Sequence, residues 1–212
     1  MRQSPVSVLL FALAISTAAS AAAGSDDGHK QIDGLIERVE ATVAEMGKSR
    51  AHLEKMLEIY HTMLGGKSAD RRAEYKELVT DIEEHKKQSI ELRNRFEELS
   101  DEAAVFFKEW QKRLGGIKSE HLRRLSEGRL KKTKEGYAQL LGEGEEAMGG
   151  FEPIVASLSD QLIYLGHDLN ATAAESLENE AGKLDSLASE LYEQIEAYAS
   201  QVDSYVGSLK PN

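Results

Sequence analysis

The sequence predicts an all-α protein: an elongated antiparallel coiled-coil or helical bundle of four to five long helices in two hairpins. Only three prolines occur in 212 residues, and 30% of the residues are charged, a composition typical of long amphipathic helices. Apolar residues recur in alternating steps of three and four, which is the spacing of a coiled-coil seam. The glycine pairs at 65–66, 115–116 and 149–150 divide the chain into segments long enough to form such helices.

The first 23 residues are typical of a secretory signal peptide, with Arg2, an apolar stretch over 6–14 and small residues after it. Cleavage sites of the A-x-A type end at Ala21 and Ala23. An uncleaved anchor is the alternative, but the apolar stretch is shorter than the about 20 residues that span a bilayer. We therefore expect an exported, periplasmic protein that is soluble after cleavage, with one elongated helical-bundle domain over residues 24–212.

The sequence contains no cysteine. This excludes a disulfide framework, a thiolate zinc site, a cysteine nucleophile and a lipid-bearing N-terminal cysteine. An exported protein of this composition must be stabilised by packing alone.

Residues 31–114 are expected to form the first hairpin. If the chain reverses at residues 65–66, apolar residues face each other in pairs whose numbers add up to 135, such as Tyr60 with Tyr75, Leu53 with Ile82 and Val39 with Phe96. In this register Arg50 faces His85, and Ser89 lies one layer away. Misplaced buried polar groups cost roughly 1–3 kcal/mol each, so a polar layer of Arg50, His85 and Ser89 would favour this register over its neighbours. A buried functional site is the alternative reading of this layer.

Residues 119–209 are expected to form the second hairpin. Its first segment, about 119–148, is the least regular, because four glycines lower its helix propensity: Gly128, Gly136, Gly142 and Gly144. Either the backbones approach closely there or the segment is partly mobile. The segment can continue, kinked at 149–150, into a helix that begins near Pro153.

The return helix of this hairpin covers about 177–209. Pairs such as Leu158 with Leu184 and Phe151 with Leu191 have numbers that add up to 342. Thr172 followed by Glu175 three residues later predicts a capping box at the start of this helix.

Charge is unevenly distributed along the chain, whose net charge is −11. From residue 135 onward there are fifteen acidic residues and two basic ones. Residues 118–134 instead carry two glutamates and seven basic residues: Lys118, Arg123, Arg124, Arg129, Lys131, Lys132 and Lys134. This basic helix either packs beside the acidic half and helps to set helix pairing, or contacts an anionic lipid or polymer surface. Export and overall acidity argue against a nucleic-acid partner.

Several motifs resemble a bacterial family described as a domain of unknown function, DUF2959. The resemblance covers roughly residue 69 to the C-terminus, and its most specific part is 153–177. It is carried by Leu122-Arg123, Ser126, Leu130, Thr133, Tyr137, Met148, Pro153-Ile154-Val155, Asp160-Gln161, Leu165, His167 and Leu169-Asn170-Ala171, together with Phe107, Glu109 and Trp110. The resemblance implies a helical envelope protein and supplies no mechanism.

Candidate chemistry is sparse. Among six histidines, only His61 lies in a Glu-x-x-His motif, with Glu58. Carboxylate-bridged di-metal bundles need two such motifs and two further carboxylates, so we expect no metal, no cofactor and no enzyme activity. His167, Asp168 and Asn170 lie at the expected tip of the second hairpin, where they would either cap backbone groups or bind a partner.

These observations favour a non-catalytic periplasmic scaffold or adaptor that binds another envelope protein. The alternative is a peripheral membrane or anionic-polymer binder that uses residues 118–134. A metal-dependent enzyme is the least favoured class. A heptad face can close within the chain or recruit a second copy, so a homo-oligomer stays open.

Overall fold

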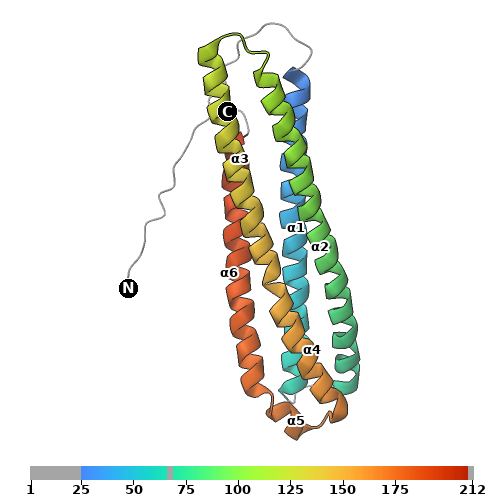
Figure 1. Cartoon of the computed structure of the whole chain (residues 1–212). Coiled ribbons are helices and arrows are strands. Elements are labelled where there is room, and N and C mark those ends of the chain that lie inside the picture. The colour runs from blue at the N-terminus through green and yellow to red at the C-terminus, as the bar shows by residue number, and fades with distance from the viewer. Residues whose placement is uncertain (1–24, 66–68, 210–212) are drawn as a thin grey trace, which may run out of the picture.

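The computed structural model describes residues 25–65 and 69–209, and within these ranges all regular structure is helical. Four long rods run alternately up and down the molecule (Figure 1). They are α1 (Ser25–Leu64), α2 (Arg71–Leu114), α3 (Glu120–Gly149) continued by α4 (Phe151–His167), and α6 (Glu178–Leu209), which follows the short α5 (Ala171–Glu175). The prediction of an all-α helical bundle is confirmed. The predicted signal peptide lies outside the described residues.

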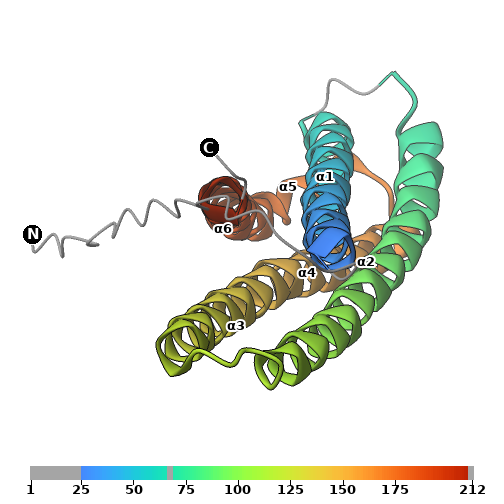
Figure 2. The same ribbon diagram turned by 90° about the horizontal axis from the view of Figure 1, so that it is seen from above.

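Each rod packs against two others. Helix α1 contacts α2 and α6, and the α3–α4 rod contacts the same two helices from the other side. Figure 2 shows the rods end-on, with α1 beside both α2 and α6. One continuous cluster of buried apolar side chains draws on every rod, so the two predicted hairpins share a single core. None of the helices in the described ranges is long and apolar enough to cross a membrane.

The register between α1 and α2 is close to the predicted one. Lys55 pairs with Glu77 at 3.0 Å, Arg38 pairs with Glu102, and the ring centroids of His52 and His85 lie 5.6 Å apart. The residue numbers of each pair add up to a value near 135. Seam residues on both helices are buried, including Val39, Leu53, Tyr60, Ile82 and Phe96.

The third rod passes from α3 into α4 almost without interruption. Gly150 keeps a right-handed helical backbone, with φ −66° and ψ −19°, and its amide donates to the carbonyl of Ala147 at 3.2 Å. Pro153 falls in the first turn of α4, where a missing amide donor costs little. The continuation expected at the glycine pair is therefore present. Contacts such as Tyr137 with Tyr205, whose ring centroids are 6.3 Å apart, extend the second register along α3 as well as α4.

Three glycines of α3 and of its junction with α4 lie where neighbouring helices approach closely. A Cβ atom on Gly144 would lie 2.7 Å from Tyr198 of α6 and nearer still to the ring of Phe96 on α2. A Cβ atom on Gly150 would lie 2.8 Å from Leu191, and one on Gly136 would lie 3.0 Å from Tyr205. Of the two explanations for the glycines of the third segment, close approach applies at these positions.

The predicted capping box at Thr172 is wrong. Asn170 is the N-cap: its backbone is extended and its Oδ1 accepts a hydrogen bond from the amide of Ala173 at 2.8 Å. Thr172 therefore lies inside α5, whose end is marked by the amide of Ser176 donating to the carbonyl of Thr172. The return helix α6 begins only at Glu178. Helix α5 starts at Ala171, before Thr172, so the side chain of Asn170 occupies the capping position and accepts from a free amide of the first turn.

A pair of glycine substitutions tests this packing. Gly144→Ala should lower the free energy of unfolding by roughly 1–3 kcal/mol, because the new methyl group must displace two aromatic rings. Gly142→Ala, at an exposed position with no neighbouring atom within 4 Å, should raise the free energy by up to about 1 kcal/mol. Urea unfolding followed by circular dichroism measures both values. Equal effects of the two substitutions would contradict the close approach.

Candidate interaction surfaces

The predicted polar layer contains one fully buried histidine. His85 is 0% exposed, and neither ring nitrogen has a hydrogen-bond partner among the described residues. Its ring lies between His52 and Phe151, with the Phe151 ring centroid at 5.2 Å. Burial, with a smaller effect of His52, lowers the pKa of His85 from 6.5 to about 4. The side chain is therefore neutral at pH 7.

The polar neighbours of His85 come from α1 and α2. His52 Nδ1 lies 3.1 Å from Gln88 Oε1, and His52 Nε2 lies 3.9 Å from Asp81 Oδ1. Lys55 Nζ lies 3.5 Å from the other carboxylate oxygen of the nearly buried Asp81. His52 was missed from the sequence because it flanks the seam rather than occupying it.

Arg50 does not join this group. Its Nη1 donates to Glu196 of α6 at 2.7 Å and its Nε donates to Glu54 at 3.1 Å. The guanidinium lies 4.7 Å from the ring centroid of Tyr192, also on α6. Ser89 Oγ donates to the backbone carbonyl of His85 at 2.9 Å. Ser89 therefore lies beside His85, as predicted. Arg50 instead connects α1 to its second neighbour, α6.

Acidification should destabilise the bundle through His85. The unfolded chain binds a proton near pH 6.5 and the folded chain only near pH 4. Between these values the unfolded state holds more protons, so the free energy of unfolding should fall by about 3 kcal/mol as the pH drops across this window. Urea unfolding at several pH values measures the decrease.

His85→Leu should remove this part of the pH dependence, and the exposed His167→Leu should retain it. The informative quantity is the difference between each variant and the unmodified protein, because that difference isolates the contribution of the substituted histidine. Identical pH profiles for His85→Leu and the unmodified protein would exclude His85 as the source.

The predicted tip site lies at the turn from α4 to α5. His167 is the last residue of α4 and is exposed. Asn170 Nδ2 donates to Asp168 Oδ2 at 2.7 Å, while its Oδ1 caps α5. Asp168 and Asn170 are therefore engaged in holding the turn. Two apolar side chains on α4 are exposed nearby, Ile163 at 61% and Tyr164 at 49%.

Substitutions at this turn test whether Asn170 stabilises the fold by capping α5 while His167 does not contribute to stability. Asn170→Ala should lower the free energy of unfolding by about 1 kcal/mol, because the amide of Ala173 loses its acceptor. His167→Ala should change it by less than about 0.5 kcal/mol, as expected for an exposed side chain at a helix end. Thermal unfolding of both variants provides the comparison, and a larger loss for His167→Ala would refute the capping role of Asn170.

The basic helix is exposed along the first half of α3. Arg123, Arg124 and Lys131 pair with glutamates one turn away on α3 itself, at distances of 3.4–3.9 Å. Arg123 and Arg124 thus pair with the two glutamates inside 118–134, whereas Lys131 pairs with Glu135, the first glutamate of the acidic half, on the same helix. Arg129 is exposed on the same half of the helix.

Two leucines lie among these cations. Leu122 is 55% exposed and Leu125 is 51% exposed. The indole nitrogen of Trp110 donates to Ser126 Oγ at 3.3 Å, which holds this part of α3 against α2. The exposed leucines therefore belong to an ordered helix that is anchored on its other side.

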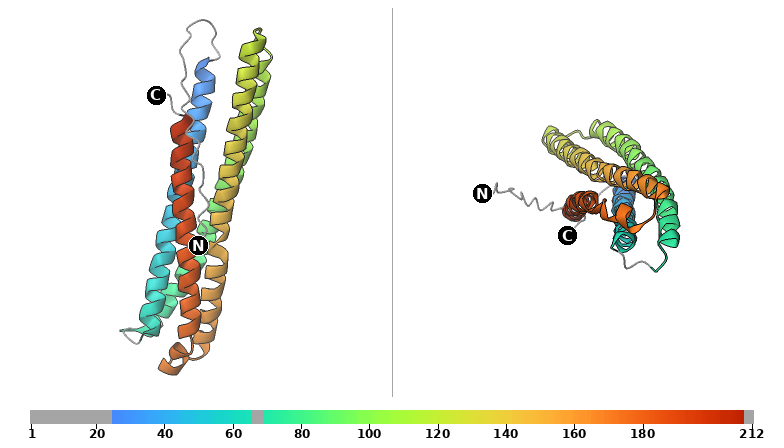
Figure 3. Two further views of the ribbon diagram at one scale, coloured as in Figure 1. Left: turned by 90° about the vertical axis from the view of Figure 1, so that its left-hand side faces the viewer. Right: turned by 90° about the horizontal axis from the view of Figure 1, so that it is seen from below.

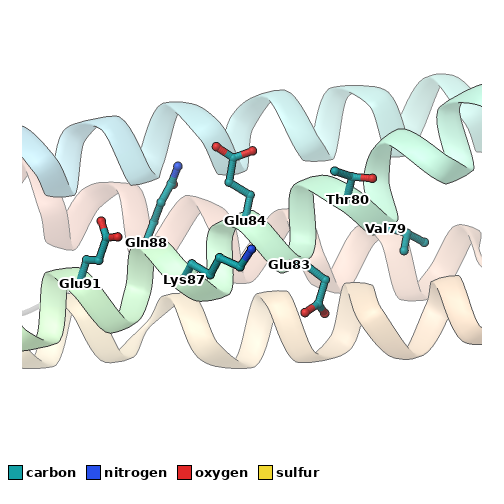
Figure 4. Close-up of a pocket in the computed structure, with 7 residues that line it drawn as sticks. All are labelled: Val79, Thr80, Glu83, Glu84, Lys87, Gln88 and Glu91. Carbon is teal, nitrogen blue, oxygen red and sulfur yellow. The ribbon is translucent and has the colours of Figure 1, made fainter.

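Two hollows lie on the surface of the described helices. One lies along the outer face of α2 and is drawn in Figure 4; it is lined by Val79, Thr80, Glu83, Glu84, Lys87, Gln88 and Glu91. All of these residues come from a single helix, so the hollow is shallow and open. A second hollow lies between α1 and α6, around Glu54, Asp185 and Tyr192.

The Glu-x-x-His motif noted in the sequence lies on the exposed surface of α1. His61 Nε2 lies 2.7 Å from Asp185 Oδ1 of α6, and both side chains are exposed. Within residues 25–65 and 69–209, no group of three or more histidine, aspartate or glutamate side chains is placed to hold a metal ion.

Fold and surface together define an elongated, up-and-down four-helix bundle with a basic helix at one end. The chain belongs to the family described as protein of unknown function DUF2959, whose sequence model matches residues 22–209. The resemblance noted in the sequence is thus confirmed, and it reaches further toward the N-terminus than residue 69. No curated protein and no solved structure matches the chain.

Proposed function

We propose that this protein is a non-catalytic scaffold or adaptor of the cell envelope that uses the two ends of its rod to hold two components apart. The observation that carries the proposal is the presence of exposed apolar side chains at both ends of a continuous core. Leu122 and Leu125 lie toward the α2–α3 turn, and Ile163 and Tyr164 lie toward α5. The envelope location rests on the predicted signal peptide.

The shape of the molecule supports this role. Helix α2 has 44 residues, which at 1.5 Å per residue corresponds to a rod of about 65 Å. The core runs along every rod, so the separation between the ends is held by packing rather than by a linker. A rod of this kind can set a fixed distance between two binding partners.

Ile163 and the ring of Tyr164 remain exposed, although the Tyr164 hydroxyl lies 3.1 Å from Ser176 Oγ. Single exposed apolar residues are ordinary on protein surfaces. Here Ile163 and Tyr164 are consecutive on one helix, and the buried face of that helix is already filled by Leu158, Leu162 and Leu165. The apolar surface of Ile163 and Tyr164 is therefore accessible to a partner. We expect that partner to be another envelope protein.

Site-specific photo-cross-linking tests the adaptor. A photoreactive residue in place of Ile163 should give a discrete protein adduct in living cells. The same residue in place of Ile90, which is also 61% exposed but lies in the middle of α2, is the matched control and should give none. No adduct at Ile163, or the same adducts at both positions, would contradict the proposal. An adduct of twice the mass of the chain would instead indicate self-association through this end.

A further inference from the structure

One face of α3 lacks the neighbour that the rest of the helix has. Leu122, Leu125, Arg129 and Gly136 follow one another in steps of three, four and seven residues, so they lie along one side of the helix. Gly136 on this side packs against Tyr205 of α6. Leu122, Leu125 and Arg129, which we call the α3 tip face, continue the line that α6 covers further down.

The α3 tip face is uncovered because α6 does not reach it. Tyr205 OH donates to the carbonyl of Thr133 at 3.0 Å, and the described part of α6 ends four residues later at Leu209. Helix α3 continues past this level to Glu120. Figure 3 shows the turn between α2 and α3 standing beyond the end of α6. The two leucines are therefore more than half exposed, although the seam position Leu130, on the α2 side of the same helix, is buried.

Charge along this part of α3 has the opposite sign to that of the whole chain. Residues 118–134 carry seven basic and two acidic residues, while the whole chain has a net charge of −11. The glutamates paired with Arg123 and Arg124 lie on the exposed helix surface, where ion pairs are weak and easily exchanged. The surface thus combines apolar side chains with flanking cations, as interfacial helices do.

We propose that the α3 tip face docks on a bilayer of anionic phospholipid. Leu122 and Leu125 enter the acyl boundary, and Arg129 with the neighbouring cations contacts the headgroup phosphates. The inference rests on the proposed function, since it names what one end of the adaptor holds. A soluble polyanion would use the cations alone, whereas a lipid surface also accounts for the two exposed leucines.

Flotation of the exported, purified protein with vesicles tests the proposal. Binding to vesicles that contain phosphatidylglycerol should exceed binding to pure phosphatidylcholine and should weaken at high salt. Leu122→Ser with Leu125→Ser should reduce binding at least tenfold. Arg123→Gln with Arg129→Gln should also reduce it at least tenfold, because each cation near an anionic surface contributes about fivefold.

Matched controls lie on the outer face of α2. Ile90→Ser removes an apolar side chain that is 61% exposed, and Lys76→Gln with Lys87→Gln removes two exposed cations. Both controls should bind as the unmodified protein does. Circular dichroism should show that all variants keep the helical fold, as expected for exposed positions.

Several results would overturn the proposal. These are equal binding to both vesicle types, indifference to the leucine pair, and binding to soluble polyphosphate that is as strong as binding to vesicles and unaffected by the leucine pair. The outcome is independent of the cross-linking test. Loss of the lipid contact with an adduct still present at Ile163 would remove this inference and keep the adaptor. Vesicle binding without any adduct at Ile163 would contradict the adaptor and support the lipid contact.

Discussion

The contact of α3 with the aromatic side chains of α2 and α6 determines how the bundle closes. Phe96 and Tyr198 come from different helices and meet over Gly144, and their ring centroids lie 6.3 Å apart. Because no side chain projects there, both helices can pack on the same side of α3. Tyr137 adds a hydrogen bond to the carbonyl of Leu99 at 3.2 Å, which links α3 to α2 a short distance further along. The registers of the two hairpins are thereby coupled in a single core.

Much of this architecture could be predicted because seam residues report which helices pair. Long apolar seams and the turns between them were enough to place α1 against α2 and α4 against α6. The same reasoning misplaced Arg50 and omitted His52, since a single seam describes one interface and each rod of this bundle has two. Residues beside the seam face the second neighbouring helix. The spacing of apolar residues within one hairpin does not predict which helix that is.

The candidate surfaces were harder to predict for different reasons. Asp168 and Asn170 were correctly placed at a turn, but capping and ligand binding use the same side-chain groups, so only the hydrogen bonds to Ala173 and between the two residues separate these roles. The exposure of Leu122 and Leu125 depends on where α6 ends relative to α3. That relation involves residues far apart in the chain, and the local pattern of α3 resembles an ordinary buried stripe.

The separation of charge along the rod has a consequence for how the molecule approaches a surface. The cations of 118–134 lie near one end, while most carboxylates of α4 and α6 lie toward the other. Such a distribution is a large electric dipole along the long axis. Near a negatively charged plane it produces a torque that turns the cationic end inward before contact is made. The α3 tip face would then reach the plane first, while the exposed side chains beside α5 lie about 65 Å further along the rod.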